Sequence, residues 1–213
     1  MTLDAGPPGG SIGESAPVSL LAGLGNAGAR YEGTRHNFGF EAVERIAGVA
    51  GARWRGMAHG CLIAEATLGG KRIVLAKPQT FMNLGGTAVG ELARARSVAP
   101  SGVMVFFDDI ALPLGTVRIR EGGSHGGHRG LQSVLEALAS QEVPRVRLGI
   151  RPEELPEDLA GFVLRRFSPE ERATVEEVLD RVVAATRTVL TEGMPKAMSL
   201  YNRAPAIDDE GGS

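Results

Sequence analysis

The chain has 213 residues, of which 43% are hydrophobic and 23% charged, a balance typical of a globular protein rather than of a disordered, collagen-like or coiled-coil chain. No uncharged apolar run approaches the roughly 20 residues of a membrane-spanning helix, and the N-terminus lacks the basic flank and apolar centre of a signal peptide. The single cysteine, Cys61, has no partner for an intrachain disulfide, so we expect a buried thiol and a reducing compartment. These features predict a cytoplasmic protein that does not enter a membrane.

The net charge of -2 is unevenly distributed along the chain. Five of the 25 acidic residues lie in residues 1–17 and 204–213, whereas every basic residue lies between Arg30 and Arg203. Twenty of the 23 basic residues are arginines, whose planar guanidinium can donate paired hydrogen bonds to a phosphate or a carboxylate. The central segment therefore permits an anionic partner. Because the pI is only about 6.1, contact with a nucleic acid would need a local basic patch.

Both ends of the chain differ in composition from the rest. Residues 1–17 are rich in glycine, proline and serine, and residues 204–213 are acidic with few large apolar side chains. Neither segment could bury enough apolar surface to offset the entropy lost on folding. We therefore predict a disordered tail at each end and one domain at 18–203, since roughly 100–200 residues usually form a single domain.

Strands and helices alternate along the predicted domain, which indicates an α/β fold. Residues 18–24 form a short apolar run that ends in glycine, as expected of a buried central strand. From residue 38 to 50 apolar side chains recur at intervals of three and four, which predicts a helix. The same criteria predict strands at 60–68 and 72–76, a helix at 84–97, strands at 103–107 and 116–120, a helix at about 130–140, a strand at 145–150, and a long helix at about 168–192 with Ser168 as its N-cap.

The strands at 60–68 and 72–76 are so close in sequence that we expect a hairpin. The helices between the other strands favour parallel neighbours. The predicted architecture is therefore a single domain with a mixed, largely parallel, twisted sheet and helices on both faces.

Two glycine-rich motifs match known functional patterns, but their surroundings do not support those functions. Residues 23–28 match the G-x-G-x-x-G of dinucleotide-binding folds, yet residues 29–37 separate them from the next predicted helix, where a helix should begin at once. Residues 122–126 match the G-x-S-x-G of α/β-hydrolases, yet no histidine follows Ser124 outside the same loop. A dinucleotide-dependent oxidoreductase therefore remains only a minor alternative.

A metal site is a further alternative. His125 and His128 could bind a divalent ion together with Asp108 and Asp109, because imidazole and carboxylate groups suit several such ions. Two histidines three residues apart in a glycine-rich loop have no fixed geometry, however, and the chain lacks the cysteines or single-helix histidine spacing of strong zinc signatures. We therefore predict no metal and no cofactor.

Polar residues follow several predicted strands, at positions that could meet at one edge of the sheet. Asn26, Asn83 and Asp108 each follow or end a strand, and ligands bind at the carboxyl ends of the strands in open α/β sheets. His36 would then lie near Asp108, whose carboxylate could fix the imidazole tautomer and stabilise the imidazolium formed when His36 takes a proton from water. This pattern predicts a general base that needs no serine or cysteine nucleophile. The alternative is a structural histidine bonded to backbone at the start of a helix.

Five segments resemble, in the same order, the signature blocks of the bacterial peptidyl-tRNA hydrolase family. They are GLGNAGARYEGTRHNFGF at 23–40, KPQTFMNLGG at 77–86, DDIALPLGTVRIREGGSHGGHRGLQSV at 108–134, RVRLGIRP at 145–152 and GFVLRRFSPEE at 161–171. Five ordered matches are far more specific than one glycine pattern. The resemblance implies a monomeric enzyme that hydrolyses the ester between a peptide and the 3′ ribose of tRNA, without a metal, and so recycles the tRNA.

The resemblance also implies roles for individual residues. His36 corresponds to the family's base for the attacking water and Asp108 to the aspartate that orients it, while Asn26 and Asn83 correspond to asparagines that hold the peptide and polarise the ester carbonyl. The segment at 161–171 resembles a mobile lid near the acceptor stem. The implied substrate-binding residues are Tyr31, near the 3′ CCA end; Phe81, Asn83, His128 and Arg129, in the cleft; and Arg120 and Arg147, which would clamp the 5′ phosphate.

One departure from the family pattern motivates a second hypothesis. Arg129 stands where the family usually has an asparagine, and a guanidinium can donate hydrogen bonds but cannot accept them. If that asparagine must accept a proton from water, the chain would be a catalytically impaired RNA-binding homologue on the same fold. The presence of both His36 and Asp108 argues against this alternative.

Overall fold

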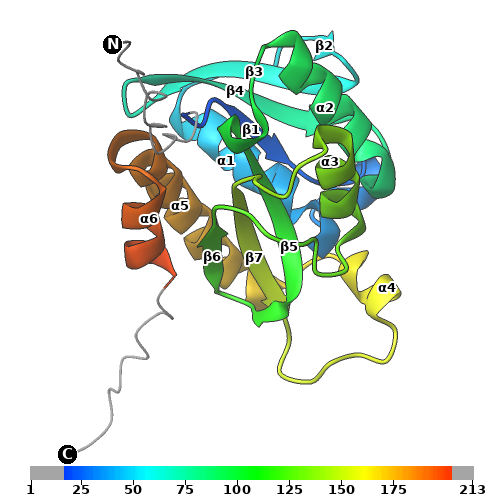
Figure 1. Ribbon diagram of the computed structural model, residues 1–213. Coiled ribbons are helices and arrows are strands. Elements are labelled where there is room, and N and C mark those ends of the chain that lie inside the picture. Colours follow the sequence, from blue (N-terminus) through cyan, green and yellow to red (C-terminus); the bar gives the residue numbers. More distant parts are fainter. Residues whose placement is uncertain (1–16, 203–213) are drawn as a thin grey trace, which may run out of the picture.

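A seven-stranded sheet with the strand order β2-β3-β4-β1-β5-β7-β6 forms the centre of the computed structural model, which describes residues 17–202 (Figure 1). The predicted tails at 1–17 and 204–213, apart from Pro17, lie outside the described residues. The strands are β1 (Leu20–Gly23), β2 (Met57–Ala58), β3 (Cys61–Leu68), β4 (Lys71–Pro78), β5 (Val103–Pro113), β6 (Val117–Arg120) and β7 (Arg145–Arg151). The α-helices are α1 (Phe38–Val49), α2 (Gly85–Ala95), α3 (Arg129–Leu138), α4 (Leu159–Val163), α5 (Pro169–Glu192) and α6 (Met194–Tyr201).

The sheet is mixed and largely parallel, as predicted. The central strands β4, β1, β5 and β7 run parallel to one another. Strand β3 pairs antiparallel with β4 and so forms the predicted hairpin, and β2 and β6 are antiparallel strands at the two edges.

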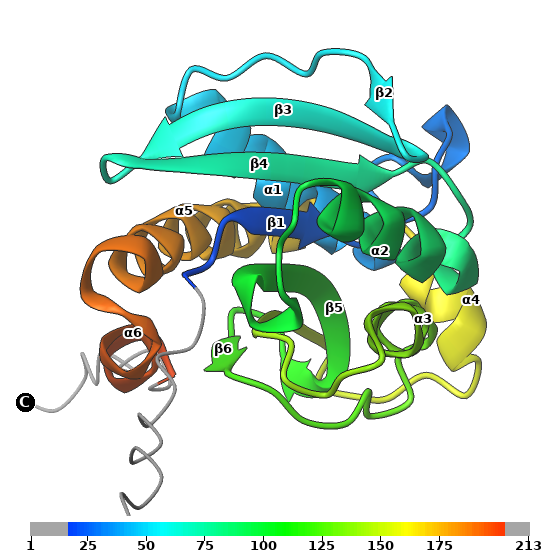
Figure 2. The same ribbon diagram turned by 45° about the horizontal axis from the view of Figure 1, so that its top comes forward.

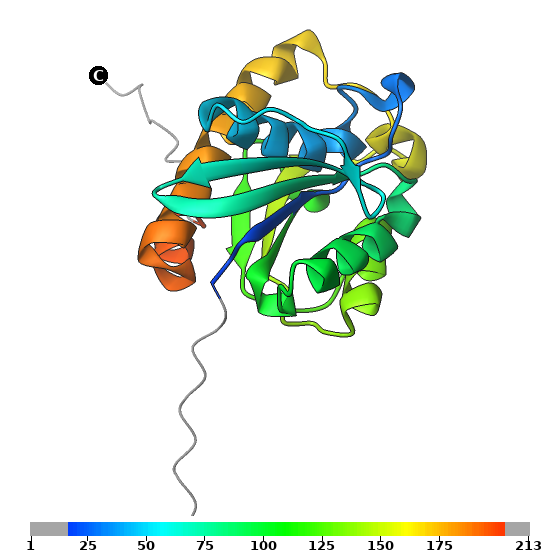
Figure 3. The same cartoon turned by 90° about the horizontal axis from the view of Figure 1, so that it is seen from above.

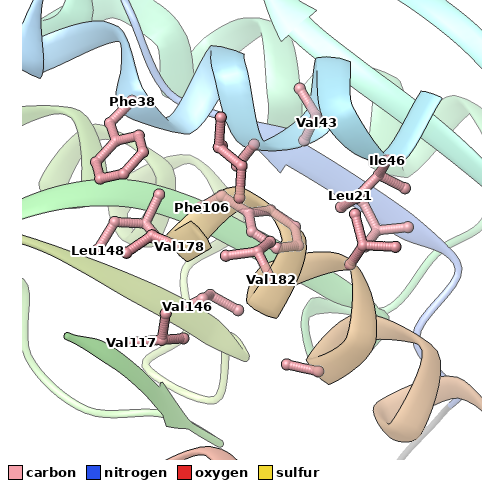
Figure 4. Close-up of a cluster of buried hydrophobic side chains, with 14 of the residues drawn as sticks. Leu21, Phe38, Val43, Ile46, Phe106, Val117, Val146, Leu148, Val178 and Val182 are labelled. Atoms are coloured by element: carbon pink, nitrogen blue, oxygen red, sulfur yellow. The ribbon is translucent and has the colours of Figure 1, made fainter. Parts of the chain in front are cut away.

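Helices cover both faces of the sheet, which confirms the predicted layers (Figure 3). Alternate residues of β1 point to opposite faces: Leu21 joins a core with α1 and α5, whereas Leu20 and Ala22 join a core with α2 and α3. Figure 4 shows the first core, in which Phe38 of α1 and Val182 of α5 lie with Phe106 of β5 in one apolar cluster. The two cores hold the strands in place, so the strand ends are fixed positions for functional side chains.

Most predicted elements are confirmed, and the differences have local causes. Ser168 is the N-cap of α5 and forms a capping box with Glu171, and Cys61 is buried. Strand β5 continues past the predicted end at residue 107 to Pro113, with a shift in pairing between Asp109 and Pro113. Neither the two-residue strand β2 nor the short helices α4 and α6 was predicted, because each is too short for a periodic pattern.

Residues 23–28 do not open directly into a helix. Two 3₁₀ turns, η1 (Ala29–Tyr31) and η2 (Arg35–Asn37), precede α1. A dinucleotide-binding turn is therefore absent from this described segment.

Among residues 17–202, no helix combines the length and apolar character required to cross a bilayer.

Helix α1 crosses β1 and β5 at very short range. A Cβ atom at Gly39 would lie 2.2 Å from the carbonyl oxygen of Phe106 and 2.6 Å from that of Leu24, so only glycine fits between these backbones. The close approach brings η2, which precedes α1, next to β5. His36 of η2 and Asp108 of β5 are thereby brought together.

We predict that Gly39→Ala lowers the free energy of unfolding by about 1–3 kcal/mol, because backbone atoms must move to accept the methyl group. Gly48→Ala, in the same helix, is the matched control: no heavy atom lies within 4 Å of its Cβ position, so it should raise stability by about 0.5–1 kcal/mol. Urea denaturation followed by circular dichroism measures both. Equal effects of the two substitutions would contradict the proposed close packing of α1 on the strands.

Candidate active site

A buried carboxylate between two imidazoles forms the centre of the site. Asp108 of β5 is 3% exposed. Nδ1 of His36 lies 2.9 and 3.0 Å from its two oxygens, and Nε2 of His128 lies 3.1 Å from Oδ1. The structure thus brings His36 and Asp108 together as predicted, and His36 is not a residue bonded only to backbone. It also adds His128 as a second partner of the carboxylate.

The hydrogen bonds define the tautomer of each histidine. The backbone N–H of Leu131 donates to Nδ1 of His128 at 3.1 Å, so the proton of neutral His128 lies on Nε2, where it is donated to Asp108. His36 likewise donates from Nδ1 to the carboxylate, which leaves the lone pair on its Nε2. The His36 side chain is 18% exposed. An accessible imidazole nitrogen of this kind can accept a proton from water.

Burial and charge shift the pKa values of the pair in opposite directions. Burial alone would raise the pKa of Asp108, but the nearby His36 and the hydrogen bonds from both histidines outweigh it and hold that pKa well below its usual range. Burial alone would lower the pKa of His36, but the charge and hydrogen bond of Asp108 outweigh it and raise that pKa above its usual value. Asp108 is therefore ionised at neutral pH and makes His36 a stronger base.

The same three side chains have the chemistry of a metal site. One ligand atom from each of His36, Asp108 and His128 lies within 4.8 Å of the others. The Nδ1 of His36 and the Nε2 of His128 already hydrogen-bond to Asp108, so a metal ion held by these two nitrogens would have to displace both imidazole protons. His125 is not part of the cluster, since its Nδ1 accepts from the N–H of Gly127 in its own loop. The absence of a required metal stays a prediction.

Asn26 connects the end of β1 to the two neighbouring turns. Its Oδ1 accepts a hydrogen bond from the N–H of Met82 at 2.8 Å, in the 3₁₀ turn η3 (Met82–Leu84). Its own backbone exchanges two hydrogen bonds with the side-chain amide of Asn37, at 2.8 and 3.0 Å. Asn83 follows Met82 and is exposed. The structure thus brings Asn26 and Asn83 to one place, with the amide nitrogen of Asn26 left for a ligand.

Asn37 is a residue beside the site that the sequence did not single out. Its side chain is buried and joins η2, which carries His36, to the end of β1. An amide that binds backbone eleven positions away has no signature of spacing or composition, so only the fold reveals it.

Three further predicted residues lie on turns or at a helix start near the cluster. Tyr31 of η1 is partly exposed, and the guanidinium of Arg30 lies 4.5 Å above its ring. Phe81, just before η3, is 56% exposed. Arg129 is exposed at the first position of α3, directly after His128. Exposed rings and a cation here suit stacking on bases and contact with phosphates.

Four arginines share one face of the edge strand β6 and its neighbour β7. Arg118 pairs with Arg147 and Arg120 with Arg145 in the antiparallel register, while the alternate residues point into the core. We call Arg118, Arg120, Arg145 and Arg147 the arginine face. Only Arg120 and Arg147 were expected from the sequence; the alternation in TVRIR and RVRLG could have indicated the other two.

The arginine face has little compensating negative charge. Arg147 donates to Asp109 at 2.5 Å, whereas Arg145 is buried and donates to three backbone carbonyls. Burial and the charge of Arg147 lower the pKa of Arg145 to about 10. The Nε of Arg118 is buried without a hydrogen-bond partner among the described residues. Like charges on paired strands repel each other, so this face is suited to an anion.

Comparison with known proteins gives one consistent result. Residues 20–209 match the family model described as "Peptidyl-tRNA hydrolase". The chain is 40% identical over 185 residues to the peptidyl-tRNA hydrolase of Alkaliphilus oremlandii, covering 87% of this chain and 100% of that protein. It is 44% identical over 185 residues to that of Desulforudis audaxviator, covering 87% and 93%. A crystal structure of peptidyl-tRNA hydrolase from Acinetobacter baumannii superposes with a TM-score of 0.82 at 28% identity, covering 87% of this chain and 94% of that one.

We predict that the pKa of His36 lies above that of an unperturbed histidine, about 6.5, and that Asp108→Asn lowers it. The substitution removes the negative charge that stabilises the imidazolium. NMR titration of the His36 imidazole protons in the parent and in the variant, in the same buffers, measures the shift. An unchanged His36 titration in the variant would contradict the proposed coupling.

Proposed function

We propose a mechanism for this chain, which belongs to the peptidyl-tRNA hydrolase family and hydrolyses peptidyl-tRNA. In this mechanism His36 is the general base that activates water, and Asp108 orients the His36 imidazole. The observation that supports this most directly is the contact of His36 Nδ1 with both Asp108 oxygens, which leaves Nε2 as the proton acceptor. A base of raised pKa suits proton transfer near neutral pH.

The reaction then takes two steps. His36 Nε2 takes a proton from water as the water oxygen bonds to the ester carbonyl carbon, and Asp108 stabilises the imidazolium. The tetrahedral intermediate collapses by breaking its bond to the ribose 3′ oxygen, which receives the proton back from His36. The products are the peptide carboxylic acid and tRNA with a free 3′ hydroxyl.

Two asparagines are suited to bind the substrate: Asn26 the charge that develops on the carbonyl oxygen, and Asn83 the peptide. The Oδ1 of Asn26 is fixed by the N–H of Met82, so its amide N–H groups are oriented in advance. The exposed amide of Asn83, next to Met82, can bind the peptide main chain. His128 keeps Asp108 ionised and in place by donating to Oδ1.

The alternative of an impaired RNA-binding homologue is not favoured. Arg129 is exposed, and the hydrogen bonds of the His36–Asp108 pair do not involve it. We assign Arg129 to substrate binding, where its guanidinium can donate to a phosphate of the 3′ CCA end beside Tyr31 and Phe81.

The arginine face is the proposed site for the acceptor stem, with Arg120 and Arg147 at the 5′ phosphate. Of its four guanidinium groups, that of Arg147 alone forms an ion pair among the described residues, with Asp109. Phosphate contacts position a nucleic acid without reading its sequence, which suits an enzyme that accepts many tRNAs. We also infer a cytoplasmic monomer, because the substrate arises on ribosomes and the resemblance to the family implies a monomeric enzyme.

We predict that His36→Ala lowers the release of N-acetylated amino acid from its tRNA by about two to four orders of magnitude, because it removes the general base. Turnover by the unsubstituted chain should persist with a chelator present. Binding of tRNA by the variant, measured separately, shows that its fold is intact. Full turnover by His36→Ala would overturn the assignment, and loss of turnover with chelator would indicate a metal.

We further predict that Arg120→Ala raises the KM for a 5′-phosphorylated substrate about tenfold, since a hydrogen bond to a charged group contributes about 1.5–3 kcal/mol. The variant should not differ from the parent on a substrate without the 5′ phosphate. Arg53→Ala is the charge-matched control, since Arg53 is exposed near the opposite edge strand, β2. A similar rise in KM on both substrates would argue against a 5′ phosphate site at Arg120.

A further inference from the structure

Arg35, the residue directly before His36, is buried although it is charged. It is 6% exposed. Its NH1 donates to the backbone carbonyls of Arg166 at 2.8 Å and Arg165 at 3.3 Å. Its NH2 donates to the two carboxylate oxygens of Glu171 at 2.7 and 2.6 Å. These bonds join the turn that carries His36 to the segment between α4 and α5.

Aromatic rings and a helix N-terminus enclose this guanidinium. It lies 4.3 Å from the ring centre of Phe162 in α4 and 5.2 Å from that of Phe167. Glu171 also accepts from the N–H of Ser168 at 2.7 Å, as part of the capping box of α5. A planar group between two rings, paired with a carboxylate that is itself fixed, has very little freedom to move.

Backbone hydrogen bonds extend the same connection. The N–H of Arg35 donates to the carbonyl of Arg165 at 3.0 Å, and the N–H of Phe167 donates to that of Gly33 at 3.2 Å. Thr34 and Arg166 form the antiparallel bridge between these two bonds. Figure 2 shows α4 at the carboxyl end of β1, where this connection lies. Residues 33–35 are therefore held along their length by residues 165–167.

The orientation of His36 depends on how its turn is held. Turn η2 is only three residues long and has no side-chain hydrogen bond at its N-cap, Thr34. Within residues 17–202, the hydrogen-bonding partner of the His36 ring is Asp108. Asn37 fixes the turn to the end of β1, and Arg35 fixes it to the opposite side, toward α4 and α5.

We propose that Arg35 is a positioning residue for His36: its bonds to Glu171 and to the carbonyls of residues 165 and 166 hold η2 so that Nδ1 of His36 faces Asp108. This role rests on the proposed function of His36 as the base. A displacement of about 1 Å in a catalytic group can lower a rate about 100-fold. Because Arg35 is buried, the effect should fall on kcat rather than on substrate binding.

The test is Arg35→Lys, which keeps a positive charge for Glu171 but lacks the planar fork that reaches two carbonyls and a carboxylate at once. We expect kcat to fall about 10–100-fold with KM changed less than about threefold. The pKa of His36, measured by NMR, should fall as the imidazole loses its alignment with Asp108. Since the base must be neutral, the acidic limb of the kcat/KM profile should move to lower pH.

Two further variants separate positioning from general stability. Glu171→Gln removes the charge but keeps oxygen and nitrogen atoms for hydrogen bonds, so it should give smaller changes in the same direction. Arg45→Gln is the matched control: Arg45 joins α1 to α5 through Glu176 and Asp180 without contacting residues 33–37. It should alter the urea midpoint and leave kcat and the His36 pKa unchanged.

A double substitution completes the test. In a His36→Ala background, Arg35→Lys should cause no further loss of turnover, because it acts through the missing imidazole. An additive loss there would overturn the proposal, as would a lower urea midpoint in Arg35→Lys with unchanged kcat and His36 pKa. If His36→Ala itself kept full turnover, the role of the base would be wrong, while the NMR titration would still test how Arg35 orients His36.

Discussion

The site depends on the burial of one ionised carboxylate, Asp108. A carboxylate removed from water is strongly destabilised unless it accepts hydrogen bonds, and here two imidazole N–H groups supply them. Those donors come from the turn before α1 and from the N-cap of α3, which lie on opposite faces of the sheet. The glycine contact of α1 with β5 and the N–H of Leu131 bonded to His128 both serve this arrangement. The core therefore has to fix the relative positions of β5, η2 and the start of α3 for the buried charge of Asp108 to be stable.

Arginine serves two physically different purposes in this chain, and composition alone does not separate them. Arg35 and Arg145 are buried and donate to backbone carbonyls, so they fix segments of chain in place. The side chains of Arg120 and Arg129 are more accessible and form no hydrogen bond or ion pair with the other described residues. Only accessible arginines such as Arg120 and Arg129 can bind a phosphate without breaking hydrogen bonds that stabilise the fold. The pI near 6.1 reflects the excess of 25 acidic over 23 basic residues, so it does not show how many of the arginines belong to a binding surface.

Local patterns predicted most of the sheet and its helices. α1 and the β3–β4 hairpin are long enough to show a period, and β1 is recognisable as a short apolar run that ends in glycine. The meeting of His36 with Asp108 followed from the general rule that strand ends converge. The contact of His128 with Asp108 and the bonds of Arg35 did not, because they join residues 20 or more than 100 positions apart that share no local pattern. Helix α6 was missed for a different reason: Gly193, with φ of 91°, ends α5, and only eight residues follow in helical form.

The hydrogen bonds of the site also bear on which esters it can accept. A free α-ammonium group, present in aminoacyl-tRNA but not in peptidyl-tRNA, needs acceptors when it leaves water. Both oxygens of Asp108 already face His36, and Oδ1 of Asn26 is occupied by the N–H of Met82. The lone pair on His36 Nε2 remains, but an ammonium group bound there would take the place of the attacking water. A peptide bond in the same position is neutral and can accept from the Asn26 amide, so the arrangement that we propose for activating water would also favour the blocked substrate.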